Sequence, residues 1–137
     1  MNYHSKGQIG YHELAKIMIG RGCSVNEPEV DRGTDMIALK DKKVALIQIK
    51  TVIMSDDKEY KTVTASGSKN GSLKERYEGR NLVVLCMSKS LERRYSLVFS
   101  SSELPDVQSL KILRNKSSLG KYERYVDAFE NLSFSTI

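Results

Sequence analysis

The sequence lacks any apolar run near the roughly 20 residues of a membrane-spanning helix, and its polar start, Met-Asn-Tyr-His-Ser-Lys, does not resemble a signal peptide. We therefore expect an intracellular, cytoplasmic protein that has no membrane partner. Cysteine is also scarce, because only Cys23 and Cys86 are present, far apart and in apolar surroundings. Without Cys-any-any-Cys spacing or a nearby histidine pair, reduced core thiols are expected rather than a disulfide or a zinc site.

Several motifs of metal and nucleotide sites are absent too. The chain has no His-Glu-any-any-His motif, no paired histidines and no Gly-rich phosphate-binding loop ahead of a helix. It also has no internal repeat, low-complexity tract or linker. Its 137 residues therefore predict a single domain, residues 1–137, large enough to bury a hydrophobic core.

Positive charge is in excess and is unevenly distributed. The formal net charge is +5, but residues 1–60 carry nine Lys or Arg against nine Asp or Glu, whereas residues 61–94 carry eight against three. Phosphate binding needs a local basic segment of this kind, since cations that neutralise phosphates release counterions. The solvated surface of a basic protein would look similar, so charge alone leaves nucleic-acid binding open.

The most informative stretch is a predicted β-hairpin. Two apolar runs, at residues 34–39 and 44–49, flank a charged tetrapeptide at residues 40–43. This pattern predicts two largely buried antiparallel strands joined by a short turn.

Three residues in this hairpin, Asp35, Gln48 and Lys50, are polar types that a packed hydrophobic core disfavours. A lone buried charge is costly unless it has a partner or a metal, so catalysis is one explanation for them. Side chains alternate along a strand, which places Gln48 and Lys50 on one face. Asp35 begins the first strand and Lys50 ends the second, so in a hairpin both lie at the same end of the sheet.

An acid, followed on the neighbouring strand by acid-any-Lys, is the signature of the PD-(D/E)XK nucleases. This sequence reads Thr34-Asp35 and then Gln48-Ile49-Lys50, so it resembles the variant subgroup in which Gln replaces the second acid. Similar Gln-any-Lys motifs occur in intron-encoded PD-(D/E)XK homing endonucleases.

The order of a Glu-bearing helix, a Gly-containing turn and this hairpin also resembles archaeal Holliday-junction resolvases. The resemblance covers residues 6–51 and becomes weaker afterwards. It implies an α/β fold, a restriction-endonuclease-like mixed β-sheet flanked by helices.

The resemblance also implies catalytic roles. Asp35 would be the principal ligand of Mg²⁺, for which Mn²⁺ can substitute, and the Gln48 amide oxygen and the Ile49 main-chain carbonyl would complete the protein ligands. Lys50 would orient or help deprotonate the attacking water, and Glu13 would act on the metal directly or through water. Because Gln48 replaces an acid, the site loses one negative charge and is expected to bind metal more weakly unless Glu13 compensates.

Glu13 falls within a predicted helix at residues 6–22, on or beside an apolar stripe that includes Leu14 and Met18. Two interpretations stay open. Glu13 is either a rim residue that reaches water or, as the resemblance implies, a carboxylate that faces the hairpin.

The rest of the chain predicts further strands at residues 60–65, 81–87 and 95–100, with 81–87 as a central strand. Residues 107–113 are ambiguous between helix and strand. Helical spacing of apolar residues predicts a final helix at 119–131.

Residues 66–80 are rich in Gly, Ser and Asn and predict a loop. Its basic and aromatic residues could follow a phosphate backbone and stack on a base or sugar, or could simply belong to a mobile surface loop. These candidate DNA-binding residues are Lys69, Lys74, Arg76, Tyr77 and Arg80.

The predicted function is that of a metal-dependent DNA endonuclease, sequence-specific in the manner of homing or restriction enzymes. A homodimer or higher oligomer is expected, because one chain carries one active site and cleavage of a duplex needs two. Alternatives are a resolvase of branched DNA, a catalytically inactive DNA-binding module on the same fold, and an interaction domain that does not bind nucleic acid.

Overall fold

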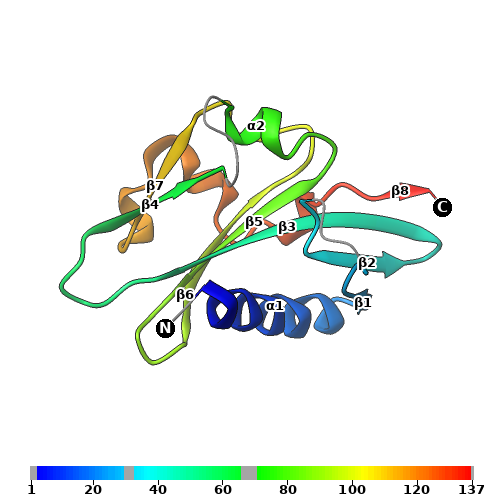
Figure 1. The fold of residues 1–137 in the computed structure, drawn as a ribbon, viewed down its shortest axis with the longest axis horizontal. Helices are drawn as coiled ribbons and strands as arrows, with labels where there is room; N and C mark the ends of the chain where they lie inside the picture. The colour runs from blue at the N-terminus through cyan, green and yellow to red at the C-terminus, as the bar shows by residue number, and fades with distance from the viewer. Residues whose placement is uncertain (1–2, 30–32, 66–70, 137) are drawn as a thin grey trace.

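The structure is a computed structural model that describes residues 3–29, 33–65 and 71–136. Its centre is a six-stranded mixed sheet in the order β1-β2-β3-β5-β6, with β8 paired to the start of β3 (Figure 1). The strands of this sheet are β1 (Ser24–Asn26), β2 (Met36–Lys40), β3 (Lys43–Ile53), β5 (Asn81–Met87), β6 (Arg93–Phe99) and β8 (Ser135–Thr136). The predicted α/β class with a mixed sheet is confirmed.

The predicted hairpin is confirmed as β2 and β3, which pair in antiparallel register from Lys40 with Lys43 to Met36 with Ile47. The two turn residues, Asp41 and Lys42, both have positive φ angles, of 52° and 61°. This conformation matches the twist of the flanking strands. β3 then continues to Ile53 and pairs in parallel with β5, so it belongs to both halves of the sheet.

Strand β5 is buried along its whole length, which explains its unbroken apolar sequence and confirms it as a central strand. Its side chains alternate between two hydrophobic cores. Val83 and Leu85 join the core under helix α1 (Tyr3–Gly20), and Leu82 and Val84 join the core on the opposite face of the sheet. The sheet is therefore covered on both faces.

The second core lies beneath a separate two-stranded sheet, made of β4 (Tyr60–Thr64) and β7 (Ser109–Leu113). Val63 and Leu110 of these strands and Leu73 of the short helix α2 (Leu73–Arg76) are buried in it. The predicted strand at 60–65 is thus confirmed as β4, and the ambiguous segment 107–113 contains a strand, β7. The predicted strand at 95–100 is confirmed as part of β6.

The predicted helix at 119–131 is wrong. The structure instead has three 3₁₀ helices: η1 (Lys116–Ser118), η2 (Gly120–Tyr125) and η3 (Phe129–Asn131). Asp127 interrupts the segment with a φ of 51°, and its carboxylate accepts hydrogen bonds from the Ser96 main-chain N–H and the Arg93 guanidinium, at 2.9 and 2.7 Å.

Tertiary packing explains why helical spacing was misleading there. Leu119 is buried in the core beneath β4 and β7, whereas Phe129 is buried in the core under α1. The apolar residues of this segment therefore cover opposite faces of the sheet instead of forming the stripe of one helix.

Both cysteines, Cys23 and Cys86, are buried and free, as expected of core thiols. Burial is also the main cause that raises the pKa of each thiol. None of the helices in the described part of the chain is long and apolar enough to cross a membrane.

Gly10 of helix α1 is buried and lies close against β3. A Cβ at this position would lie 2.0 Å from Thr51 Oγ1 and 3.2 Å from Ile49 Cγ2. Gly7, one turn earlier in the same helix, has no atom within 4 Å of such a Cβ. The packing of α1 against β3 therefore requires glycine at position 10 but not at position 7.

We expect Gly10→Ala to lower the free energy of unfolding by about 1–3 kcal/mol, because Thr51 would have to move out of a packed contact. Gly7→Ala, the matched control, should raise it by about 0.5–1 kcal/mol, because alanine favours a helix interior. Urea denaturation of both variants checks this. Similar effects of the two substitutions would contradict the close approach of α1 to β3.

Candidate active site

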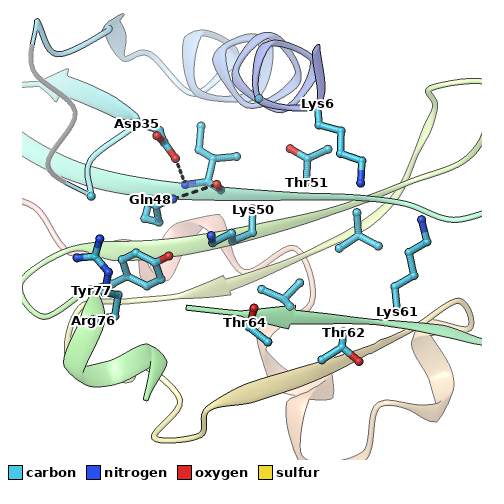
Figure 2. Close-up of a pocket in the computed structure, with 15 residues that line it drawn as sticks. Lys6, Asp35, Gln48, Lys50, Thr51, Lys61, Thr62, Thr64, Arg76 and Tyr77 are labelled. Atoms are coloured by element: carbon cyan, nitrogen blue, oxygen red, sulfur yellow. Dashed lines mark hydrogen bonds between the residues drawn. The ribbon is translucent and has the colours of Figure 1, made fainter. Parts of the chain in front are cut away.

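The three polar residues of the hairpin line one open cavity of about 620 Å³ (Figure 2). Asp35 immediately precedes β2, and Gln48 and Lys50 lie two apart on β3. The structure therefore brings together Asp35, Gln48 and Lys50, which the sequence places at one end of the hairpin.

The cavity lies just before the first residue of β2, where the pairing of β2 with β3 stops and this edge of β3 becomes open. The last β2–β3 pair is Met36 with Ile47, and the Asp35 main-chain N–H still donates to the Ile47 carbonyl at 2.8 Å. Two residues further along β3, the Ile49 N–H donates instead to Asp35 Oδ2 at 2.9 Å. The Asp35 carboxylate thus accepts the hydrogen bond that the next strand residue would otherwise accept from β3. This hydrogen bond fixes the orientation of the carboxylate.

Gln48 is buried, and its amide nitrogen donates to the Ile49 carbonyl oxygen at 3.3 Å. With the nitrogen used as the donor, the amide oxygen is the atom suited to binding a cation. Main-chain groups of one residue share one strand edge, so the Ile49 carbonyl points to the same open edge as its N–H.

These donors fit a hard divalent cation such as Mg²⁺, which prefers oxygen ligands and retains several waters. Asp35 supplies a carboxylate oxygen, Gln48 an amide oxygen and Ile49 a main-chain carbonyl. Among the described residues, no three His, Cys, Asp or Glu side chains gather where they could hold a metal. The donor set therefore suits a metal that takes one carboxylate and otherwise neutral oxygen ligands.

The Lys50 ammonium lies 5.6 Å from the ring centroid of Tyr77, which packs against the second core. Tyr77 is only 1% exposed. A ring buried to this extent cannot stack on a base, so the structure does not support the stacking role predicted for Tyr77. Its ring instead lies beneath the Lys50 ammonium group.

The other candidate DNA-binding residues lie in different surroundings. Lys74 and Arg76 are exposed on α2, and Arg76 also lines the cavity. Arg80 is half-buried, and its Nε donates to Thr34 Oγ1 at 2.9 Å. Lys69 lies outside the described residues.

Arg80 also packs against the backbone that leads into Asp35. Gly33 has a φ of 84°, and a Cβ there would lie 3.6 Å from the Arg80 guanidinium. Together with the bond to buried Thr34, this contact connects Arg80 to the two residues before Asp35. Sequence spacing alone did not indicate this role.

Glu13 does not line the cavity that contains Asp35. Its carboxylate is 3.1 Å from the Lys16 ammonium and 3.6 Å from the Arg93 guanidinium, and it lines a second cavity with His12 and Leu91. The α1 residues that line the Asp35 cavity, Lys6 and Gly7, lie at the start of the helix, whereas Glu13 lies two turns later and contacts Arg93 of β6. The geometry therefore does not support a metal-binding role for Glu13.

The structure adds cavity residues that the sequence did not indicate, chiefly Lys6 at the start of α1 and Lys61 on β4. In the described part of the chain, four cationic side chains line the cavity, those of Lys6, Lys50, Lys61 and Arg76, against a single carboxylate, that of Asp35. The cavity is therefore suited to a polyanion. No local sequence pattern links Lys6 or Lys61 to Asp35, since their proximity depends on how α1 and β4 pack.

Comparison by sequence finds no match, either to a protein-family model or to a curated protein. Comparison of structures does find similar proteins. The bacterial homing endonuclease I-Ssp6803I aligns over 94% of this chain and 89% of its own, with a TM-score of 0.67 and 15% identity. Hjc, a Holliday junction resolvase from Archaeoglobus fulgidus, aligns over 88% of this chain and 89% of its own, with a TM-score of 0.51 and 13% identity. The protein therefore has a fold similar to that of a homing endonuclease and of a Holliday junction resolvase, the two kinds of protein that its hairpin motif resembles.

Proposed function

We propose that the protein is a metal-dependent DNA endonuclease that hydrolyses phosphodiester bonds in the cavity around Asp35. The observation that carries this proposal is the meeting of Asp35, Gln48 and Lys50 at the open edge of β3, in a nuclease fold. The excess of cationic side chains around them suits the charge of a DNA backbone.

Mg²⁺, or Mn²⁺ in its place, would be held by Asp35, the Gln48 amide oxygen and the Ile49 carbonyl. When bound, such an ion lowers the pKa of a coordinated water and neutralises charge on the phosphate. The protein's own contribution is orientation, because the Ile49 N–H fixes the Asp35 carboxylate and the Gln48 amide is held against the Ile49 carbonyl.

Lys50 is the residue that would act on the nucleophile. Its ammonium shares the cavity with Asp35 and lies over the buried Tyr77 ring, which limits the positions that the long side chain can take. A fixed positive charge there would orient the attacking water and stabilise the charge that develops on the phosphorus oxygens.

The substrate we favour is duplex DNA cut at a specific sequence by a homodimer or higher oligomer. Supporting this, a homing endonuclease gives the higher TM-score of the two neighbours described. The residues that the structure describes also hold one cavity lined by Asp35, Gln48 and Lys50, whereas a duplex has two strands to cut. Resolution of branched DNA is the second candidate, because the fold is also similar to that of a Holliday junction resolvase.

The first test compares cleavage of supercoiled plasmid and of a synthetic four-way junction, with Mg²⁺ and then Mn²⁺. We expect metal-dependent product from the wild type, and a loss of about 100-fold or more in Asp35→Asn and Lys50→Ala, because each removes a charge placed at the reacting phosphate. Lys116→Ala is the control, since this exposed lysine on η1 does not line the cavity. Cleavage that persists in Asp35→Asn would rule out this site, and DNA binding without product would favour the binding-only alternative.

Gln48→Glu tests the metal ligands directly. The substitution adds a carboxylate beside Asp35, so we expect the dissociation constant for Mn²⁺ to fall about 10-fold, or roughly 1.4 kcal/mol, in isothermal titration calorimetry. Gln108→Glu, at an exposed position outside the cavity, should leave it unchanged. An unchanged Mn²⁺ affinity in Gln48→Glu would mean that residue 48 does not contact the metal.

We expect Arg80 and Arg76 to have different roles, although the sequence predicts both as DNA-binding residues. Because Arg80 contacts Gly33 and Thr34, we expect Arg80→Ala to lower kcat about 10-fold by misplacing Asp35, with little change in KM. Arg76→Ala should mainly raise KM, because its exposed side chain lines the cavity. A rise in KM alone for Arg80→Ala would instead indicate that Arg80 binds phosphate.

A further inference from the structure

The open edge of β3 extends beyond Asp35. On the edge that β2 covers, no strand in the described part of the chain pairs with β3 past Ile47, whereas β5 covers the opposite edge from Ile47 to Ile53. The cavity follows this open edge, since its lining includes consecutive β3 residues from Gln48 to Val52. A ligand longer than one phosphate therefore has a continuous path along the strand.

Two lysines reach this path from opposite faces of the sheet. Lys6 lies one helical turn before Gly10, the residue of α1 that touches Thr51, so it belongs to the helix face that meets β3. Lys61 shares its face of β4 with buried Val63, so it points toward the main sheet. Figure 2 shows the two ammonium groups directed toward each other at the end of the cavity away from Asp35.

The charges at this end of the cavity lack a protein counterpart in the described residues. Neither Lys6 nor Lys61 takes part in the ion pairs found there, and Asp35, at the far end, is the one carboxylate among the described lining residues. Two ammonium groups that face each other repel, and an anion between them would remove that repulsion. A phosphate group has the charge and the acceptor oxygens for this position.

We propose that Lys6 and Lys61 form a subsite for a backbone phosphate of the same DNA strand whose scissile phosphate lies at Asp35 and Lys50. This rests on the proposed nuclease function and extends it, because it sets the path of the strand. The substrate backbone runs along the open edge of β3, from the Asp35 end toward the gap between α1 and β4. The subsite fixes the strand's direction and position and does not touch the reacting atoms.

The test measures binding without cleavage. A fluorescein-labelled duplex of random sequence is titrated in EDTA at several salt concentrations, and the double variant Lys6→Gln/Lys61→Gln is compared with Lys111→Gln/Lys116→Gln. The control pair removes the same charge from exposed positions outside the cavity. Glutamine keeps most of the side-chain length, so the two variants differ in where the charge is lost.

We expect the Lys6/Lys61 variant to bind about 10-fold more weakly, and the slope of log K against log salt to become shallower by about one unit, as for one phosphate contact. The control pair should bind within about twofold of the wild type. Equal behaviour of the two double variants would overturn the subsite, even if plasmid cleavage and its dependence on Asp35 are observed. Conversely, a specific loss of DNA binding without any cleavage would support the subsite and count against the nuclease proposal.

A competition experiment separates a DNA phosphate from free phosphate as the ligand. At constant ionic strength, millimolar inorganic phosphate should displace the duplex from the wild type no more than chloride does. Stronger displacement by phosphate that disappears in the Lys6/Lys61 variant would assign the pair to free phosphate and overturn its assignment to a DNA strand.

Discussion

The hydrogen bond from the Ile49 N–H to the Asp35 carboxylate is the contact on which the candidate site depends. It forms where β2 stops pairing with β3, so a side chain replaces the main-chain partner that the next strand residue would have supplied. A hydrogen bond to a charged group contributes roughly 1.5–3 kcal/mol, and here it also fixes the position of the carboxylate. Because the ladder ends at this point, the Ile49 carbonyl and the Gln48 amide face an open edge instead of another strand.

The second constraint is that β3 is covered on both faces by different structures. Ile47 and Ile49 are buried beneath α1, while Val52 is buried beneath β4 and β7. Gln48 and Lys50 share the face of Val52, so they are held against a packed core without being sealed from solvent on the open edge. Glu13 of α1 lies away from this cavity, where it pairs with Lys16 of the same helix and with Arg93 of β6.

Elements that depend on interactions between sequence neighbours were predicted correctly, whereas features that depend on contacts between distant segments were not. The hairpin was predictable because the apolar runs and the charged turn are local signals, and the buried strand β5 was predictable because both of its faces need apolar side chains. The helix expected at 119–131 failed because its apolar residues serve two separate cores, and because the Asp127 carboxylate is bound by β6. Tyr77 was interpreted as a stacking residue because the composition of a loop does not reveal that its single aromatic ring is buried.

By itself the sequence determined the hairpin and the placement of Asp35, Gln48 and Lys50 at one end of it, since strand alternation and turn chemistry act between neighbours. Only the tertiary structure decided what else surrounds them. Arg80 reaches Thr34 from 46 positions away, and Lys6 and Lys61 enter the cavity from elements that cover opposite faces of the sheet. Such contacts depend on how separately formed elements pack, and the residue spacing within each element does not encode that arrangement.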